Sequence, residues 1–236
     1  MKILKKSIVV IPARGGSKRL PRKNLLDLGG KPLIAHTIET ALEAGIFETV
    51  LVSTDDPEIA NVAKGYDDVI IDDRTSELAG DFVKVVDVIE EICSRTDIRN
   101  CYDIVCMMLP TAPFRSASDL WKGATLFGRD VDAVVSFAEY EFPPSMAVSL
   151  ADDCVMTPMF RDSPLISGDT RSQDQAVSLR PNGAFFISWI TSFLKNKSFY
   201  KGTVKGVLMD RWSSIDIDER DDLLLANMII DAGFLK

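Results

Sequence analysis

Basic residues and glycines gather near the N-terminus, directly after an apolar run that ends at Ile11. The segment contains, in order, Arg14, Gly15, Gly16, Ser17, Lys18, Arg19, Lys23 and Asn24. Glycines let a ligand approach the backbone closely, and cations and a hydroxyl can donate hydrogen bonds to phosphate oxygens. The segment is neither a Walker A loop nor a dinucleotide-binding motif, because it lacks G-x-x-x-x-G-K-S/T and G-x-G-x-x-G. The pattern favours a polyphosphate-binding loop, with a flexible charged turn as the alternative.

Two carboxylates near the C-terminus, Asp216 and Asp218, alternate with Ile215 and Ile217. Residues i and i+2 of an extended segment face the same side, so both carboxylates share one face. Beside a phosphate site, such a pair suits Mg²⁺, which takes one or two carboxylates together with phosphate oxygens. The alternatives are a half-buried strand without a metal, or a cap that Asp218 places on the last helix.

Together the two patterns predict nucleotidyl transfer. That reaction needs cations around a triphosphate and a metal near the α-phosphate, and little covalent chemistry from the protein. The single histidine, His36, is interpreted as structural, because the chain has no G-x-S-x-G motif to supply a hydrolase nucleophile. The net charge of −8 argues against a nucleic-acid partner.

The elements that position these residues alternate between strands and helices. Strands are expected at Ser7–Ile11, Thr49–Val52, Val69–Ile71, Ile104–Leu109, Ala133–Phe137, Ala184–Ile187 and Val204–Met209. Helices are expected between Pro32 and Gly45, at Pro57–Lys64, Val85–Ile92 and Ser118–Phe127, and last on a face of Leu225, Met228, Ile229 and Ala232. This alternation predicts a single α/β domain over residues 1–236, with a Rossmann-like, mostly parallel sheet covered on both faces.

The alternation breaks between Glu139 and Pro181, where prolines are frequent and apolar runs are short. We expect a small inserted arm or lobe at about 139–182, for which an oligomer contact is one use. The four cysteines lack zinc-site spacing and are expected as small apolar core residues. No run of 18 apolar residues predicts a membrane span, and Ile8–Ile11 is too short for a signal-peptide core, so the cytoplasm is the expected location.

The segment Ile11–Asn24 resembles the signature of the acylneuraminate cytidylyltransferase family, the CMP-sialic acid synthetases. The resemblance continues in the family's order through Val52–Asp55, Arg74–Ala79, Pro110–Pro113, Arg180–Ala184 and Ser214–Asp218. It implies a fold of the nucleotide-diphospho-sugar transferase type and a homodimer that exchanges an arm. It also implies the transfer of CMP from CTP to a nine-carbon 2-keto-3-deoxy sugar acid, with Mg²⁺ as cofactor and pyrophosphate as product.

The resemblance also implies roles for individual residues. The CTP phosphates would be held by Arg14, Gly15, Gly16, Ser17, Lys18 and Lys23, with Lys18 and Lys23 also stabilising the charge of the reaction. Asn24 would close that loop, Arg74 would lie against the nucleotide, and Asp216 and Asp218 would bind Mg²⁺. The sugar side would be lined by Arg171, Arg180, Asn182 and Gly183, with Arg171 or Arg180 gripping the sugar carboxylate.

Two residues of the expected sugar side, Leu109 and Phe186, depart from the family, where a glutamine and a tyrosine are familiar. Their apolar surface slightly favours a sugar with a deoxy or acylated tail. N-acetylneuraminic, legionaminic and pseudaminic acids all stay candidates. An eight-carbon sugar acid, another sugar, or a non-catalytic nucleotide-binding protein on the same fold are the alternatives.

Overall fold

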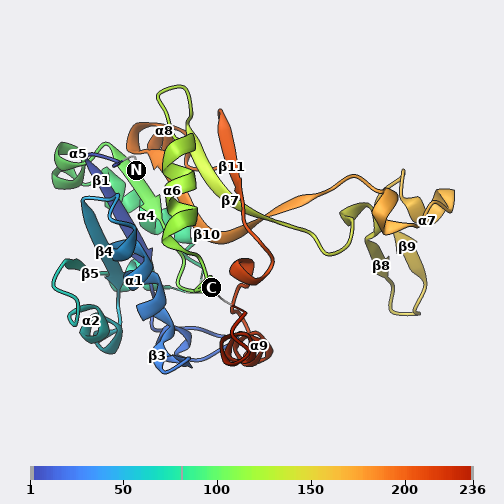
Figure 1. The fold of residues 1–236 in the computed structure, drawn as a ribbon, viewed down its shortest axis with the longest axis horizontal. Helices are drawn as coiled ribbons and strands as arrows, with labels where there is room; N and C mark the ends of the chain where they lie inside the picture. Colours follow the sequence, from blue (N-terminus) through green and yellow to red (C-terminus); the bar gives the residue numbers. More distant parts are fainter. Residues whose placement is uncertain (1–2, 81, 235–236) are drawn as a thin grey trace.

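A seven-stranded sheet forms the centre of the molecule (Figure 1). The computed structural model describes residues 3–80 and 82–234. The strands of this sheet are β1 (Ser7–Pro12), β4 (Thr49–Thr54), β5 (Val69–Asp73), β6 (Ile104–Met107), β7 (Ala133–Glu139), β10 (Leu179–Trp189) and β11 (Val204–Leu208). They lie in the order β11-β7-β10-β6-β1-β4-β5, and only the two pairs that involve β10 are antiparallel. The predicted mostly parallel sheet is confirmed.

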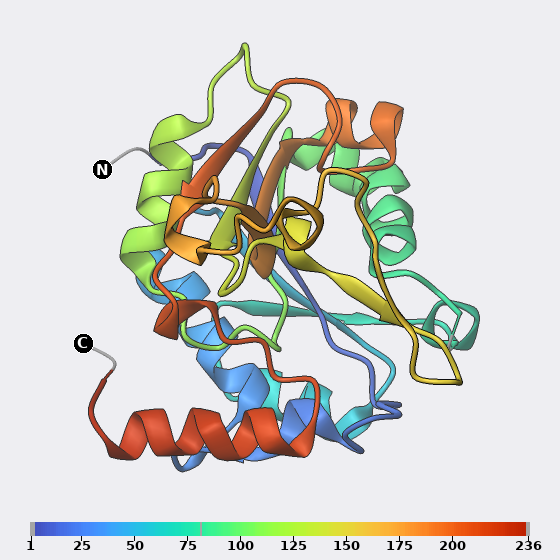
Figure 2. The ribbon, with the colours of Figure 1, turned by 90° about the vertical axis from the view of Figure 1, so that its right-hand side faces the viewer.

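Helices cover both faces of this sheet (Figure 2). The longer ones are α1 (Leu33–Ala44), α2 (Pro57–Ala63), α4 (Val85–Ser94), α6 (Ala117–Leu126), α8 (Ile190–Asn196) and α9 (Arg220–Asp231). The shorter ones are α3 (Ser76–Ala79), α5 (Thr96–Cys101), α7 (Pro164–Ser167) and the 3-10 turns η1 (Lys23–Leu25), η2 (Pro144–Met146), η3 (Ser172–Asp174) and η4 (Trp212–Ser214). Helices α1 and α6 pack with Val9 and Ile11 of β1, while α4 and α8 pack with Ile8 and Val10. All six residues of β1 are buried, since both faces of this central strand are covered.

A third, smaller apolar cluster joins the two ends of the chain. Leu20 of the basic loop and Ile217 of the carboxylate segment pack there with Ala226 and Ile229 of α9. The hairpin of β2 (Asp27–Leu28) and β3 (Lys31–Pro32) contributes the buried Leu28. The cluster therefore brings the basic loop and the carboxylate pair to one side of the sheet.

The apolar face expected for the last helix is buried only in part. Ile229 is buried, but Leu225 and Met228 are 47% and 67% exposed, and Ala226 is buried instead. Ala226 and Ile229 of α9 pack in the small third cluster, and a narrow apolar stripe on the helix is enough to bury this contact.

Residues 140–178 leave the sheet between β7 and β10 and form an arm that projects from the domain (Figure 1). The arm carries a hairpin of β8 (Val148–Leu150) and β9 (Met156–Pro158), followed by α7. Its boundaries differ slightly from the expected 139–182, because Leu179, Arg180 and Pro181 pair with the last residues of β7. These paired ends of β7 and β10 form the stalk of the arm.

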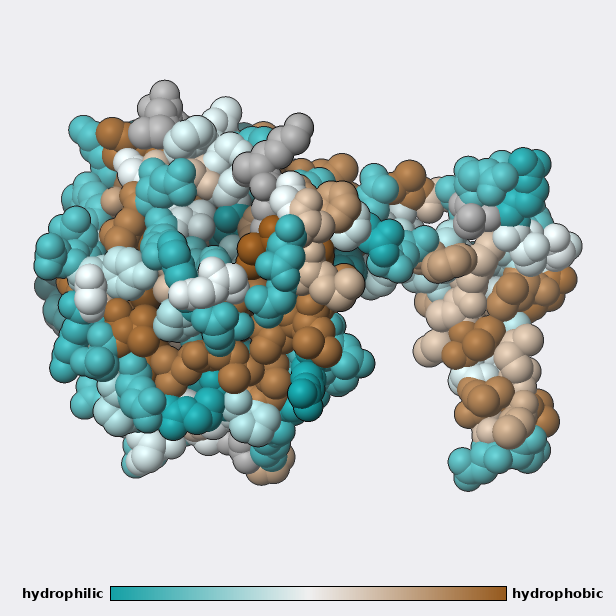
Figure 3. All heavy atoms as spheres, turned by 60° about the horizontal axis from the view of Figure 1, so that its bottom comes forward, coloured by the Kyte–Doolittle hydropathy of each residue, from teal (hydrophilic) through white to brown (hydrophobic). Residues whose placement is uncertain are grey.

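The surface of the arm is rich in apolar side chains (Figure 3). Those that are between 38% and 67% exposed include Val148, Leu150, Val155, Met156, Met159, Phe160, Leu165 and Ile166. Apolar surface that gathers on one extended element is typical of a protein–protein contact.

Two smaller predictions have mixed outcomes. Cys93 and Cys106 are buried, as expected, but Cys101 and Cys154 are exposed because they lie at the end of α5 and in the β8–β9 connection. The histidine prediction fits, since the His36 ring lies 2.8 Å from the carbonyl oxygen of Leu28. Within residues 3–80 and 82–234, no helix has the length and apolar character needed to cross a bilayer.

Candidate active site

The two predicted chemical patterns line one cleft, with a volume of about 550 Å³. The cleft lies where β1 and β6 end, and ligands of open α/β sheets bind beyond such carboxyl ends. Its walls are the basic loop after β1, the turn after β6 and the carboxylate segment before α9. Its charged side chains are four cations, Arg14, Lys18, Arg19 and Lys23, and two carboxylates, Asp216 and Asp218. This balance gives the cleft two excess positive charges.

Hydrogen bonds from neighbouring segments hold the basic loop in place. The Gly15 N–H donates to Asp55 Oδ1 at 3.0 Å, and Asn24 Nδ2 donates to the Arg14 carbonyl at 3.0 Å. A Cβ atom at residue 15 would lie 2.6 Å from Asp56 Oδ2, so the close approach of the loop to α2 requires glycine. Lys18 Nζ lies 5.8 Å from the centroid of the exposed Phe82 ring. Asn24 thus closes the loop, while contact with phosphates stays a prediction.

Asp218 joins the two patterns directly. Lys23 Nζ lies 2.7 Å from Asp218 Oδ1, and Arg19 Nη2 lies 2.6 Å from Asp218 Oδ2. Partial burial alone would raise the pKa of Asp218, but the hydrogen bonds and charges of Lys23 and Arg19 hold this pKa below its ordinary value. The Lys23 side chain is only 12% exposed. Asp218 therefore neutralises a cation that has little contact with water.

Asp216 has the opposite electrostatic setting. Solvent reaches its carboxylate through the open cleft, but protein surrounds it on most other sides. This desolvation raises the pKa of Asp216, and the charge of Asp218 adds to the rise, although a hydrogen bond from the Thr111 side chain opposes it. The Ile217 N–H donates to the Thr111 carbonyl at 2.7 Å, and the Ile217 side chain is buried. Because isoleucines alternate with aspartates in this extended segment, both carboxylates face the cleft.

The carboxylate pair fits a metal that arrives with a phosphate ligand. Both groups are hard oxygen donors, and the raised pKa of Asp216 indicates that additional positive charge would be favourable there. Among the described residues, no group of three or more His, Cys, Asp or Glu side chains is placed to hold a metal. The remaining ligands would therefore have to come from phosphate oxygens and water, as Mg²⁺ commonly takes them.

Several residues expected on the sugar side lie close to the carboxylate segment. Leu109 lines the cleft, and the Cβ position of Gly183 lies 3.4 Å from Leu109 Cδ1. Asn182 is buried and donates to Ser214 Oγ at 2.9 Å, which fixes the segment before Asp216. Arg180 lowers the pKa of Asp216 through its charge. These positions support the site, whereas contact with a sugar stays a prediction.

For three expected site residues, the structure shows contacts outside the cleft. Phe186 is 4% exposed and packs 5.4 Å from Phe199 between ring centroids, because its position in β10 faces the layer of α4 and α8; its expected place in the sugar pocket is wrong. Arg74 is 7% exposed and donates to the Ser53 carbonyl at 2.6 Å; it is not among the residues that line the cleft, but its charge interacts with that of Arg14 in the basic loop. Arg171 lies on the arm, where its exposed side chain pairs with Asp174 at 3.2 Å. Arg171 belongs to the arm, which projects from the domain (Figure 1), and it is not among the residues that line the cleft of its own chain.

Comparison with known proteins adds to this geometry. A family model described as cytidylyltransferase matches residues 8–124. The pseudaminic acid cytidylyltransferase of Campylobacter jejuni is 34% identical over 229 residues, which cover 95% of this chain and 96% of that protein. The CMP-N,N'-diacetyllegionaminic acid synthase of Legionella pneumophila is 32% identical over 228 residues, with 95% and 96% covered. The chain belongs to the acylneuraminate cytidylyltransferase family.

Some relatives in this family are longer. The N-acylneuraminate cytidylyltransferase of Streptococcus agalactiae serotype V is 35% identical over 226 residues, and the match covers 93% of this chain but 52% of that protein. The chain thus spans about half the length of these streptococcal relatives. Among solved structures, a CMP:2-keto-3-deoxy-manno-octonic acid synthetase complexed with CTP is similar at a TM-score of 0.67 and 19% identity, covering 97% of this chain and 100% of that one. This similarity confirms the predicted nucleotidyltransferase fold.

Two polar residues of this cleft were given no individual role by the family resemblance. Arg19 was counted among the cations of the basic loop, but its ion pair with Asp218 forms because the two ends of the chain meet. Thr111 lies in the motif Pro110–Pro113, which could have drawn attention to it. Arg19 holds Asp218 and Thr111 holds Ile217, and a motif does not reveal such contacts between residues far apart in the sequence.

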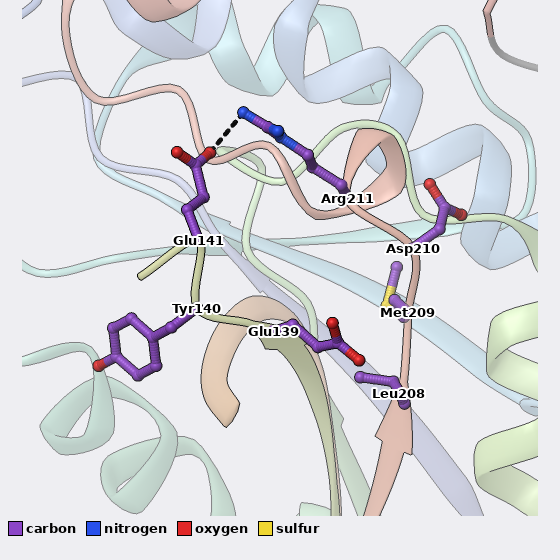
Figure 4. A pocket seen from close by; sticks show the side chains of 7 residues that line it. All are labelled: Glu139, Tyr140, Glu141, Leu208, Met209, Asp210 and Arg211. Atoms are coloured by element: carbon purple, nitrogen blue, oxygen red, sulfur yellow. Dashed lines mark ion pairs between the residues drawn. The ribbon is translucent and has the colours of Figure 1, made fainter. Parts of the chain in front are cut away.

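A second hollow, of about 560 Å³, lies at the root of the arm (Figure 4). Its charged residues are Glu139, Glu141, Asp210 and Arg211, and Arg211 already pairs with Glu141 at 2.6 Å. Three carboxylates against one guanidinium disfavour an acidic ligand. The cleft with excess positive charge is therefore the better site for anions.

The ion pairs of Asp218 make a prediction for anion binding. Asp218→Asn should tighten the binding of inorganic pyrophosphate about threefold to tenfold without divalent metal, since a unit charge this close is worth on the order of 1 kcal/mol. Isothermal titration calorimetry in EDTA at low salt would measure this. Glu219→Gln is the matched control, because exposed Glu219 contacts Arg19 only at 3.9 Å and should change the affinity less. Weaker binding by the Asp218 variant would contradict the account.

Proposed function

We propose that this chain transfers CMP from CTP to a nine-carbon 2-keto-3-deoxy sugar acid of the sialic-acid type and releases pyrophosphate. The single observation that carries the proposal is the cleft in which a basic, glycine-containing loop meets a carboxylate pair. Excess positive charge suits a triphosphate, and the family relatives are named for N-acylneuraminic, pseudaminic and N,N'-diacetyllegionaminic acids.

In the proposed reaction the protein mainly binds and orients. The loop would hold the triphosphate through the Arg14, Lys18 and Lys23 side chains, with Ser17 and the Gly15–Gly16 backbone beside them. The anomeric hydroxyl of the sugar attacks the α-phosphorus, the bond to pyrophosphate breaks, and the hydroxyl proton passes to water. Lys18 and Lys23 stabilise the negative charge that builds during this step. Asp216 and Asp218 would hold Mg²⁺, which when bound neutralises charge at the phosphates.

Substrate binding would exchange the ion pairs of the cleft. In this structure, Lys23 and Arg19 bind Asp218. The phosphates of CTP would compete for these cations and leave the Asp218 carboxylate for Mg²⁺. Because every charge finds a new partner, the exchange would leave neither Lys23 nor Asp218 unpaired in the partly buried wall.

The cation for the sugar carboxylate would come from a second copy of the chain. Arg171 is exposed on an arm that projects from its own domain, and the arm has apolar surface that a partner would bury. A homodimer that exchanges arms would bring Arg171 of one protomer to the cleft of the other. A guanidinium can grip a carboxylate through two parallel hydrogen bonds. We place this homodimer in the cytoplasm.

The test of the activity is pyrophosphate release from CTP with N-acetylneuraminic, legionaminic and pseudaminic acids, and with an eight-carbon sugar acid. We expect turnover with at least one nine-carbon acid, and Asp216→Asn should lower kcat about 10²-fold, as loss of one electrostatic stabiliser does. Circular dichroism would show that the variant is folded. With Phe186 in the core, only Leu109 supports an apolar tail. Turnover with the eight-carbon acid alone would contradict the sugar assignment, and no turnover with any acid would contradict the activity.

Arm exchange predicts complementation between two inactive variants. Arg171→Ala and Asp216→Asn homodimers should each be nearly inactive, because every cleft lacks one group. After unfolding and refolding as a mixture, hybrid dimers contain one cleft with Asp216 and the partner's Arg171. Activity should then return to about a quarter of that of the unmodified protein, the statistical share of complete clefts. If Arg171 served the cleft of its own chain, the mixture would stay inactive.

A further inference from the structure

A buried arginine lies beneath the cleft, outside the set of residues that line it. Arg115 is 2% exposed, and its Nη1 donates to Thr37 Oγ1 of α1 at 2.8 Å. Its Nη2 donates to the carbonyl oxygen of Leu109. Within the described part of the chain, its Nε is buried without a hydrogen-bond partner.

This arrangement is unfavourable if Arg115 only fills the core. Both of its hydrogen-bond partners are uncharged oxygens, and an apolar side chain of similar volume is often as stable as a buried charge, or more so. Burial lowers the pKa of Arg115 to about 9, so the group still carries its charge at neutral pH, and the negative charge of Asp216 favours that charged form. An unsatisfied buried group of this kind calls for a functional explanation.

The contacts of the Leu109 carbonyl provide a functional explanation for the buried Arg115. The Ala112 N–H also bonds to this oxygen at 3.4 Å, which closes a turn with Pro110 at its second position. Leu109, Pro110 and Thr111 of this turn line the cleft. The Thr111 carbonyl in turn accepts from the Ile217 N–H at 2.7 Å, and the Thr111 side chain lies close enough to Asp216 to lower the pKa of that carboxylate. A continuous set of hydrogen bonds therefore runs from Thr37 through Arg115 and the turn to Ile217, which lies between the two carboxylates.

We infer that Arg115 is a positioning residue: from beneath the cleft it holds the turn Leu109–Ala112, and through Thr111 it fixes where the Asp216–Asp218 segment lies. The inference rests on the proposed function for its effect on turnover, but not for its effect on the unliganded protein. A displaced carboxylate segment would lower kcat more than it raises the KM for CTP, because the basic loop supplies most of the ground-state contacts with the phosphates.

The test combines hydrogen–deuterium exchange with kinetics. In unliganded Arg115→Met, exchange should rise in peptides that cover 109–116 and 214–218 and stay unchanged elsewhere. Turnover should fall about 10²-fold, since small misplacements in a site have effects of that size. Arg115→Lys, which keeps a charge and a donor for the Leu109 carbonyl, should recover part of both. Arg95→Met is the matched control: Arg95 pairs with Asp72 and Glu91 outside the residues that line the cleft, so its loss should leave exchange at 214–218 and kcat unchanged.

Each outcome is decisive. Unchanged exchange at 214–218 in Arg115→Met, or an even rise over the whole chain, would overturn the inference. If Arg115→Met does not fold, Thr37→Val removes the other anchor of the guanidinium and should produce the same local rise. The exchange measurement needs no substrate. If the unmodified protein shows no CMP transfer, the proposed function fails while the positioning role is still tested.

Discussion

The charge balance around Asp218 is the constraint on which the site depends. Lys23 is nearly buried, and a buried cation needs a partner. Asp218 supplies that partner from the opposite end of the sequence, and Arg19 shares it. The N-terminal loop and the C-terminal carboxylates therefore define each other's position, although 195 residues separate Lys23 from Asp218.

Apolar packing brings the two segments of the Lys23–Asp218 contact together. The small cluster around Ala226 and Ile229 of α9 receives Leu20 from the loop and Ile217 from the carboxylate segment. The turn after β6 adds a second attachment through Thr111, and Asn182 adds a third through Ser214. Apolar burial thus brings the two segments together, and hydrogen bonds set their orientation. Helix α9, at the edge of the domain, is in this sense part of the site.

The sequence predicts best what depends on near neighbours along the chain. The central strands, the basic loop and the i, i+2 placement of Asp216 and Asp218 all follow from local periodicity, and the structure places both carboxylates in the cleft. The arm was located by its prolines and short apolar runs. Local patterns alone predict nucleotidyl transfer. The family signature added the nucleotide and the class of sugar acceptor.

What local patterns leave out involves relations in space. Phe186 was expected on the sugar side, but the register of β10 turns its side chain to the core. The direction of the arm that carries Arg171 cannot be predicted from local sequence patterns. The contacts of Arg115 likewise form only where α1 and the turn after β6 meet. Which face of α9 is buried likewise depends on the size of the cluster it covers.

The proposed exchange of ion pairs is tested most directly by a crystal structure of the CTP complex, in which the distance from Lys23 Nζ to Asp218 Oδ1 can be measured. This distance is 2.7 Å in the structure described above. The account predicts that the pair separates, with Lys23 and Arg19 donating to phosphate oxygens and Asp218 turned toward the phosphates with Asp216. A complex in which CTP is bound while the Lys23–Asp218 pair stays intact and the phosphates lie away from the Arg14–Asn24 loop would contradict it.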